Sequence, residues 1–436
     1  MSTRDGHVIL GVNALVLGYL PASWQSPRLH AHSFVDPDYW TRIAQTAERG
    51  TLDALFLADI PALYDPTYDA NPAHLEPTVN WAHVAAHTEH IGLVATASTT
   101  FNDPAELAER LATLDYVSGG RAAWNIVTSR GPAPARNFGL PDVPLRDDRY
   151  ERASEFVDVV TGLWDSARTG RSVVHHGEHF DVAGRLRTPP SPQGAPVLFQ
   201  AGGSVKGRAL AGRVAEGVFA AELTLDGAIE HYRQVKRLAV AAGRSPDAVK
   251  IVPGLLTTLG STHAEAVRRS DDLHDAGPPS YSVRWLSGAI GVDASTFDLD
   301  APFPREVLDA PPDLQHFTGS VGFRESIVAQ IRRTDPTVRE YLRQSRYLGS
   351  GHTGFVGTPE ELADRIEEWF AAGGVDGFNL QPDVLLDGLE VIVDEVIPIL
   401  RRRGLYRHEY ATSTLRGHLS AAAPSAPLHT PARASA

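Results

Sequence analysis

Short apolar runs alternate with helix-like segments along most of the chain, and this alternation restricts the possible folds more than any other feature. Helical spacing of apolar residues predicts helices between the strands. Such repetition is typical of a parallel sheet covered by helices. We expect strands at residues 7–16, 52–58, 91–97, 122–128, 196–201, 217–221, 249–259 and 375–380, and helices at 37–49, 78–89, 104–116, 149–164 and 205–215.

Two arrangements satisfy this pattern, a closed (β/α)8 barrel and an open doubly wound sheet. About eight strand–helix units in one chain favour the barrel, so the predicted fold class is α/β, a (β/α)8 TIM barrel with insertion segments. We expect one barrel domain over residues 1–416. Prolines interrupt the pattern at about 266–352, which predicts an inserted lid or substrate-binding region. Residues 417–436 have few large apolar side chains and are expected to be disordered.

Composition excludes several kinds of chemistry. The 436 residues include no cysteine, which rules out disulfides, thiolate metal sites, iron–sulfur clusters and thiol nucleophiles. The net charge of −13 argues against nucleic acid or an anionic membrane as a partner. The first apolar run is broken by Asn13 and Gly18, and no segment is long and apolar enough to span a membrane. We therefore expect a cytoplasmic protein.

Polar residues interrupt or follow three of the expected strands. Asn125 lies inside the apolar strand of SGGRAAWNIVTS (118–129), where an amide requires either a ligand or a fixed polar network. Asp59 follows strand 52–58 and is either a carboxylate at the mouth of the barrel or a cap for the next segment. Thr96 belongs to a hydroxyl-rich strand end that lines a pocket or forms a turn.

A glycine-rich turn joins strand 196–201 to the helix that follows it. Gly202, Gly203 and Ser204 would leave backbone N–H groups free at a helix N-terminus, which attracts phosphate. A plain tight turn is the alternative. Arg149 and Tyr150 open another expected helix, and either side chain would reach the same phosphate, unless Tyr150 only packs against the barrel.

The histidines give little support for a metal site. His83 and His87 are four residues apart, as in a helical ligand pair, but no glutamate follows His83. His175, His176 and His179 are expected in a surface turn before a strand. We therefore expect no metal.

Taken together, a series of ordered motifs resembles the bacterial luciferase-like flavin monooxygenases. The resemblance is strongest to the branch with nitrilotriacetate monooxygenase component A, dibenzothiophene-sulfone monooxygenase and the pristinamycin synthase large subunit. The motifs are AERGTLDALFLAD (47–59), TEHIGLVATASTT (88–100), ATLDYVSGGRAAWNIVTS (112–129), NFG (137–139), RYERASEFVDVVTGLW (149–164), HHGEHFDVAGRLRTPPSPQGAPVLFQAGGS (175–204), VGTPEELAD (356–364), DGFNL (376–380), VIPILRRRGL (396–405) and YATSTLRGHL (410–419).

The resemblance implies a two-component monooxygenase. A separate NAD(P)H-dependent flavin reductase would supply FMN as FMNH2, and O2 would add to the flavin as a C4a-peroxide that oxygenates a small organic substrate. It also implies a homodimer or homotetramer. An F420-dependent oxidoreductase of the same barrel superfamily and a non-catalytic flavin-binding relative are the alternatives. The substrate itself is not implied.

Site residues follow from the resemblance by position. Tyr150, Gly203 and Ser204 would bind the flavin phosphate, whereas Asp59, Thr96 and Asn125 would face the ring system or the ribityl chain. Arg146 stands where family members often carry histidine, and an arginine would still hold phosphate. His352 matches a family histidine near the pocket and is a candidate acid or base, as is His32, with anchoring of the lid as the structural alternative for His352.

Overall fold

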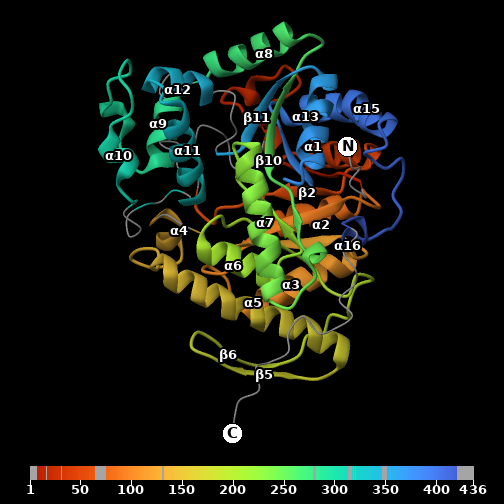
Figure 1. The fold of residues 1–436 in the computed structure, drawn as a ribbon. Helices are drawn as coiled ribbons and strands as arrows, with labels where there is room; N and C mark the ends of the chain where they lie inside the picture. The colour runs from red at the N-terminus through yellow and green to blue at the C-terminus, as the bar shows by residue number, and fades with distance from the viewer. Residues whose placement is uncertain are drawn as a thin grey trace.

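Parallel strands form the centre of the molecule in a computed structural model (Figure 1). The structure describes residues 7–15, 17–30, 32–63, 75–129, 132–277, 281–312, 317, 319, 321–345 and 351–419. Ten strands make one sheet: β1 (Ile9–Asn13), β2 (Ala54–Leu57), β3 (Gly92–Ser98), β4 (Ala122–Val127), β7 (Val197–Gln200), β8 (Gly217–Val218), β9 (Lys250–Ile251), β10 (Gly254–Leu259), β11 (Thr353–Gly357) and β12 (Gly377–Pro382).

The strand order is β11-β10-β12-β1-β2-β3-β4-β7-β8-β9, and every pair of neighbouring strands in this sheet is parallel. The sheet curls because the chain segment 250–259 contributes to both ends of it. In that segment β9 pairs with β8, whereas β10 pairs with β12. Val252 and Pro253 separate the two strands, and proline has no N–H to donate to a ladder. The described ladder is therefore a curled parallel sheet rather than a fully closed barrel.

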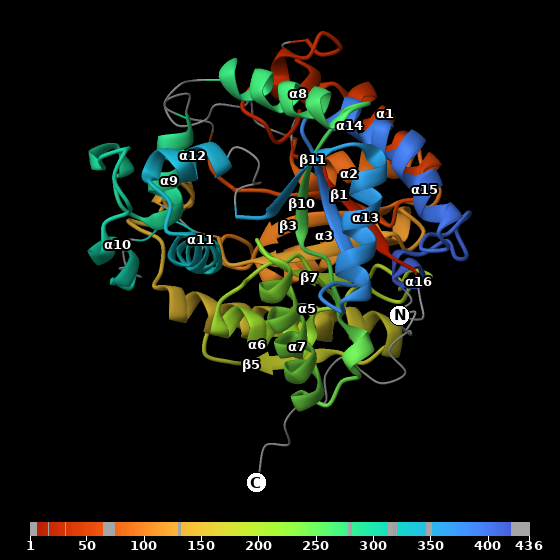
Figure 2. The same cartoon turned by 45° about the horizontal axis from the view of Figure 1, so that its top comes forward.

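Helices cover the outer face of the sheet, as the alternation predicts (Figures 1 and 2). Side-chain caps fix where several of them begin: Asp36, Asp103 and Thr358 each accept a backbone N–H from the first turn. The covering helices are α1 (Pro37–Arg49), α2 (Pro77–Ala85), α3 (Pro104–Val117), α4 (Pro132–Asn137), α5 (Arg146–Thr169), α6 (Val205–Val214), α7 (Leu225–Ala241), α8 (His263–Asp275), α13 (Pro359–Ala371), α14 (Leu385–Val391) and α15 (Ile397–Arg402), with a π-helical turn at Ile392–Val396.

Short 3-10 helices lie at Ser23–Gln25, Ser33–Val35, Pro246–Ala248 and Ala294–Thr296. The antiparallel hairpin of β5 (Val173–His176) and β6 (Asp181–Gly184) lies against the outside of α5, at the bottom of Figure 1. His175 and His176 are therefore strand residues, and only His179 lies in the turn, which corrects the predicted surface turn. The Glu155 carboxylate on α5 accepts the backbone N–H groups of His179 and Phe180, and this contact fixes the hairpin.

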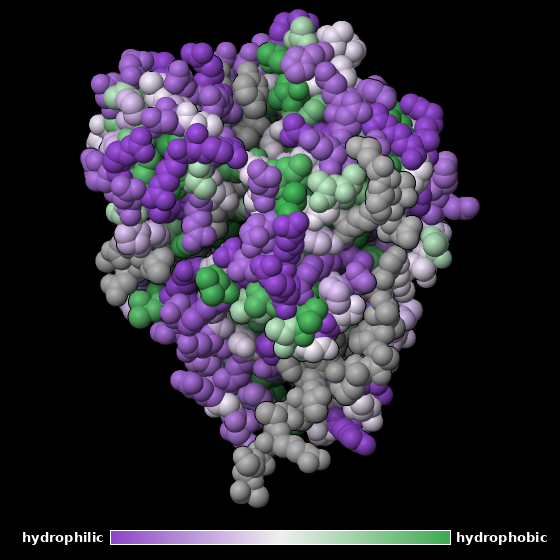
Figure 3. All heavy atoms as spheres, in the orientation of Figure 1, coloured by the Kyte–Doolittle hydropathy of each residue, from purple (hydrophilic) through white to green (hydrophobic). Residues whose placement is uncertain are grey.

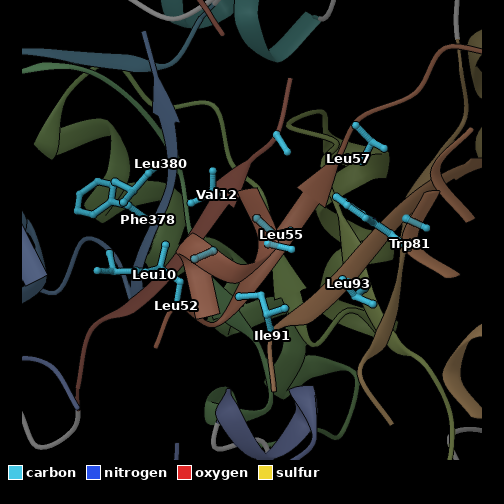
Figure 4. Packing of buried hydrophobic residues seen from close by; sticks show 14 of the residues in the cluster. Leu10, Val12, Leu52, Leu55, Leu57, Trp81, Ile91, Leu93, Phe378 and Leu380 are labelled. Carbon is cyan, nitrogen blue, oxygen red and sulfur yellow. The ribbon is translucent and has the colours of Figure 1, made fainter. Parts of the chain in front are cut away.

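Alternate residues of the strands form two apolar layers. Side chains such as Leu10, Leu55 and Leu93 point outward and pack under the helices with Trp81 (Figure 4). The residues that alternate with these along each strand, such as Ile9 and Phe56, point inward and form a smaller cluster inside the curl of the sheet. Successive side chains of a strand point to opposite faces of the sheet, so a single apolar run contributes residues to both layers. This explains the near-continuous hydrophobic strands of the sequence.

A short C-terminal helix, α16 (Leu415–His418), closes the interior at the ends where the strands begin. Leu415 and Leu419 belong to the inner cluster, and the guanidinium of Arg416 forms an ion pair with Glu216 at 2.7 Å. The disorder predicted from residue 417 onward is therefore wrong for residues 417–419, because buried apolar contacts hold them. Residues 420–436 lie outside the described part of the chain.

Residues 281–345 form a helical lobe beside the sheet (Figure 2). It comprises α9 (Tyr281–Ile290), α10 (Arg305–Asp309), α11 (Val321–Thr334) and α12 (Val338–Ser345). Leu286, Phe303, Ile327 and Tyr341 are among the buried residues of a core separate from that of the curled sheet and its covering helices, which are together called the barrel below. The predicted insertion is thus an ordered helical lobe in its described residues, and its role as a lid stays a prediction.

The face shown in Figure 3 is mostly hydrophilic, with hydrophobic residues in small scattered groups. Across the described ranges, no helix has the length and apolar character needed to cross a membrane. The predicted α/β class and the helix-covered parallel sheet are confirmed.

Candidate functional site

A cavity of about 270 Å³ lies where the strands end, between the sheet and the helical lobe. Residues after β2, β4 and β7 line one part of it, the beginning of α5 lines a second part, and the lobe lines a third. The carboxyl ends of parallel strands are where α/β proteins bind their ligands. Five of the predicted site residues line this cavity: Asp59, Arg146, Tyr150, Gly203 and Ser204.

One end of the cavity is built to receive an anion. Ser204 is the N-cap of α6, and its Oγ accepts the N–H of Gly207 at 3.1 Å, which leaves the hydroxyl hydrogen available for a ligand. The first turn of α6 contributes free backbone N–H groups and the positive end of the helix dipole. A Cβ on Gly202 would lie 2.8 Å from the Tyr150 hydroxyl and would also collide with the Gln200 amide. Glycine is therefore needed for this close approach.

Tyr150 and Arg146 face this end from α5. The helix begins at Arg146, three residues before the predicted start, so that Arg146 and Tyr150 are one turn apart on the same face. The Arg146 guanidinium carbon lies 5.8 Å from the centre of the Tyr150 ring. A guanidinium and a phenol hydroxyl thus approach the N-terminus of α6 from the opposite wall, which is a suitable set of donors for a phosphate.

The end of β4 also contributes to the cavity. Ser129 has a φ of 48°, a left-handed conformation that is uncommon for serine, and its buried Oγ has no hydrogen-bond partner within the described residues. The guanidinium of Arg149 donates to the Ser129 carbonyl, and Thr100 donates to the Thr128 carbonyl at 2.7 Å. Arg149 therefore holds the strand end in place, and strained backbone of this kind is frequent at functional sites.

Thr96 and Asn125 lie inside the curl of the sheet and do not line the cavity as described. They are neighbours in the β3–β4 register, and the Asn125 amide donates to the Thr96 hydroxyl at 2.9 Å. The Asn125 Oδ1 has no partner in the described structure. A fixed polar contact therefore satisfies one half of the amide, and contact of the other half with a ligand stays a prediction.

His352 precedes β11 and is buried behind Phe323, a residue that lines the cavity. Its ring stacks on Phe219 at 4.8 Å and meets Phe323 edge-on at 5.1 Å, while Nδ1 lies 3.2 Å from the Ala220 carbonyl. Because a carbonyl only accepts, Nδ1 carries the hydrogen and Nε2 carries the lone pair. Burial lowers the pKa of His352 to about 4, so the ring is neutral at physiological pH.

His32 is exposed and precedes the 3-10 helix Ser33–Val35, and it does not line the cavity. Its catalytic role stays a prediction without support from its position. The hydroxyl-rich strand end after Thr96 forms a turn, because Ser98 Oγ accepts the backbone N–H groups of Thr100 and Phe101. Among the described residues, no group of three or more histidine, aspartate or glutamate side chains is arranged to hold a metal ion.

Sequence reasoning missed the apolar wall of the cavity. Phe317, Val321 and Phe323 come from the helical lobe, and Ile60 comes from the segment after β2. These residues lie in stretches without strand or clear helical periodicity, so their sequence gave no signal of a shared surface. Gln200 also lines the cavity, and its Oε1 has no partner within the described ranges. An amide at the end of an apolar strand was a signal that would have identified it.

The fold and the site define a parallel α/β protein with an anion-binding cradle beside an apolar wall. The family model described as luciferase-like monooxygenase matches residues 17–377. The chain is 38% identical to N-acetyl-S-(2-succino)cysteine monooxygenase of Bacillus subtilis, over 97% of this chain and 99% of that protein. It is 39% identical to nitrilotriacetate monooxygenase component A of Aminobacter aminovorans, over 95% and 96% of the two chains.

A solved structure of riboflavin lyase RcaE, with modified FMN and riboflavin, is similar to this chain with a TM-score of 0.81. It is 31% identical in sequence, and the match covers 95% of this chain and 96% of that one. The chain belongs to the luciferase-like monooxygenase family. It is a flavin-dependent monooxygenase that uses reduced FMN, and the resemblance seen in the sequence motifs is confirmed.

The cradle fits the phosphate of FMN on physical grounds. The N-terminus of α6, the Ser204 hydroxyl, the Tyr150 hydroxyl and the Arg146 guanidinium all supply hydrogen-bond donors to one place. The close approach at Gly202 allows the backbone to come near the ligand. The unpartnered buried Oγ of Ser129 and Oε1 of Gln200 offer further contacts beside it.

Proposed function

We propose that this protein is the oxygenase of a two-component system. A separate NAD(P)H-dependent flavin reductase supplies FMNH2, and the protein uses it with O2 to oxygenate a small organic substrate. The cavity carries this proposal, because it joins an anion cradle at α6 to an apolar wall from the helical lobe. One part suits the phosphate of a cofactor and the other suits an organic molecule.

The proposed contacts divide the cofactor among the seven residues predicted to bind it. Gly203, Ser204, Tyr150 and Arg146 bind the phosphate, since they surround the N-terminus of α6. Asp59 at the cavity wall, with Thr96 and Asn125 beneath it, faces the ring system or the ribityl chain. Thr96 and Asn125 are buried inside the curl of the sheet, where their hydrogen bond to each other fixes both side chains.

Bound reduced flavin supplies the electrons that activate O2, and the protein positions the reactants and excludes water. Phe323 and Phe317 contribute to this exclusion as part of the apolar wall. His352 would accept a hydrogen bond at Nε2, because Nδ1 is directed at Ala220 and the ring is neutral. We therefore assign His352 the role of acceptor or base and not that of an acid.

The apolar wall of the cavity also indicates which kind of substrate the protein accepts. Ile60, Phe317, Val321 and Phe323 are all apolar, which favours a substrate whose buried part is hydrophobic. The relatives named above act on carboxylated molecules, N-acetyl-S-(2-succino)cysteine and nitrilotriacetate. We propose that this chain accepts a less polar substrate than these two. The choice of substrate then depends on the helical lobe, which contributes Phe317, Val321 and Phe323 to the wall.

We further propose a homodimer or homotetramer in the cytoplasm. For the sheet, we propose the closed eight-stranded form of the barrel, supported by segment 250–259, which pairs with β8 through β9 and with β12 through β10. Light scattering of the purified protein would give the number of subunits.

Removal of the Ser204 hydroxyl tests the cradle. Ser204→Ala should weaken binding of FMNH2 about tenfold, because one donor to the phosphate is lost, and should lower the free energy of unfolding by about 1 kcal/mol through the lost helix cap. Thr224→Ala is the matched control, since Thr224 caps α7 in the same way and does not line the cavity. Anaerobic titration of each variant with FMNH2 gives the affinities.

The result that contradicts the cradle is equal weakening, or none, in the two variants. Failure of the wild-type protein to bind FMNH2, together with no reductase-dependent oxygenation of any tested compound, would contradict the function as a whole. Competition by F420 would support the alternative oxidoreductase. Flavin binding without coupled oxygen consumption would support the non-catalytic relative.

A further inference from the structure

Three amide side chains gather inside the curl of the sheet, and no role has yet been assigned to them. Asn13 ends β1, whereas Asn379 and Gln381 lie on the same face of the neighbouring strand β12. Their exposed fractions are 2%, 3% and 0%. Buried neutral amides are unusual, and these three lie in an interior that also holds an apolar cluster and the Thr96–Asn125 pair.

Several polar atoms of these amides have no hydrogen-bond partner in the described part of the chain. Both amide atoms of Asn379 and the Oδ1 of Asn13 are unpartnered, whereas the Tyr19 hydroxyl contacts the Nδ2 of Asn13 and also the amide of Gln381. A buried amide without partners costs free energy, and proteins keep such groups where a ligand completes them. This cluster, Asn13, Asn379 and Gln381, is named the amide cluster below.

Glycines on the flanking strands give the amide cluster its room. Asn379 is in register with Gly11 on one side and with Gly254 on the other. A Cβ on Gly11 would lie 3.1 Å from the Asn379 Oδ1, and a Cβ on Gly254 would lie 2.7 Å from the Gln381 Nε2 and 2.5 Å from the His352 Nδ1. The missing side chains let the amides and His352 occupy the interior, beside the ring that we assign to the site.

The amide cluster lies across the sheet from the phosphate cradle. The cradle follows β7, and strands β4, β3 and β2 separate β7 from β1, with β12 beyond it. Strands this far apart face each other across a curled sheet. A phosphate held at Ser204 therefore leaves the remainder of an FMN molecule to extend over the interior toward β1 and β12.

We propose that the amide cluster binds the pyrimidine edge of the isoalloxazine ring and so sets the direction in which the ring lies. This inference rests on the proposed binding of FMN at the cradle. The pyrimidine edge presents a carbonyl, an N–H and a second carbonyl, which primary amides match because each offers both a donor and an acceptor. The dimethylbenzene edge presents no such groups, so it points away from the cluster.

Replacement of the two amides on β12 tests the contact. Asn379→Leu and Gln381→Met should each raise the dissociation constants of FMN and of riboflavin about tenfold, since both ligands carry the ring. Ser204→Ala should weaken FMN alone, because riboflavin has no phosphate. Fluorescence titration under air with oxidised FMN and riboflavin gives the affinity of each of the three variants for both ligands, and it does not depend on turnover.

Thermal unfolding of the ligand-free variants separates a binding role from a structural one. Amides that are unpartnered without ligand contribute nothing to folding, so Asn379→Leu should melt at the wild-type temperature or above it. Asn80→Leu is the matched control, because Asn80 is equally buried with both amide atoms unpartnered among the described residues, but it lies on the covering helix α2 and not inside the curl of the sheet. It should leave the affinities for both flavins unchanged.

Modified flavins test the direction of the ring. A methyl group on N3 blocks the pyrimidine edge, so 3-methyl-FMN should bind the wild-type protein at least tenfold more weakly than FMN, whereas 8-chloro-FMN should bind normally. The Asn379→Leu variant should lose most of the discrimination against 3-methyl-FMN. The opposite preference would overturn the inference, and so would wild-type affinity in both amide variants, which would mean that the cluster is only hydrated. No flavin binding by the wild-type protein would instead overturn the proposed function.

Discussion

The barrel and the helical lobe bury their charged groups in different ways. Inside the barrel, Arg416 and Glu216 form an ion pair whose side chains are 4% and 8% exposed. In the lobe, the pair between Arg339 and Asp300 is 51% and 73% exposed. The barrel therefore holds a charge pair inside its core, whereas the lobe has a small apolar core, keeps this ion pair at its surface, and satisfies its buried Arg324 with backbone carbonyls instead of a carboxylate. The lobe should therefore tolerate substitution of its exposed charges, and it is also the region that supplies the apolar wall of the cavity.

The largest effect should come from breaking the buried pair. Arg416→Met leaves the Glu216 carboxylate uncompensated in the interior, and it also removes the donor to the carbonyls of Gln193 and Ala195. The free energy of unfolding should fall by about 3–5 kcal/mol. Urea denaturation followed by circular dichroism measures this change.

The double variant Arg416→Met with Glu216→Leu provides the control. Replacement of both charges by apolar side chains should recover most of the lost stability, because no buried charge remains. If the single variant lost less than about 1 kcal/mol, the barrel would not depend on this pair more than the lobe depends on its surface charges.

An intermediate effect is expected at His352, which lies between the barrel and the lobe. Its pKa is about 4 in the folded protein, compared with 6.5 as the ordinary value, so only the unfolded chain binds the proton between these pH values. Stability from this group is complete above pH 6.5 and is lost as the pH falls toward 4. The free energy of unfolding of the wild type should decrease by about 3 kcal/mol more than that of His352→Gln over this range.

Denaturant titrations of both proteins at several pH values between 4 and 7 measure that difference. Other titrating groups, including Asp115, whose pKa burial raises to about 6, are common to the two proteins and cancel. Parallel pH curves for the two proteins would show that His352 is accessible to water, and the assignment of a neutral acceptor would then be wrong.

The smallest effect is expected within the lobe. Arg339→Ala removes an exposed pair with Asp300, and the free energy of unfolding should change by less than about 0.5 kcal/mol. The affinity for FMNH2 should stay at the wild-type value, since neither residue lines the cavity. A large loss of stability would show that surface charges hold the lobe as firmly as the buried pair holds the barrel.

Much of the sheet was predictable because the apolar runs of the sequence coincide with the buried strands of the structure. Strand 91–97 was expected one residue early at both ends and appears as Gly92–Ser98. Segment 249–259 was expected as one strand, but Pro253 lacks a donor and divides it into β9 and β10. β11 was missed, because its five residues TGFVG include two glycines and show no apolar alternation.

The candidate site was predictable where chemistry is local to the sequence. The cradle at Gly203 and Ser204 follows from a strand, two glycines and a helix, and the structure places these residues in the cavity. The apolar wall brings Phe323 to a strand end more than a hundred residues away in sequence, and no local pattern encodes that contact. His32 was named as a candidate from its position after Trp24 in the sequence, but the structure does not place it at the cavity.

The helix α16 has a consequence for the order in which the molecule is made. Leu415, Arg416 and Leu419 seal the interior against strands that begin up to about 400 residues earlier in the chain. During synthesis on the ribosome the inner apolar face of the sheet and Glu216 therefore stay uncovered until residue 419 has emerged. A ribosome-bound chain that ends before residue 415 should be a good substrate for chaperones, whereas release of the last segment should complete folding in one step.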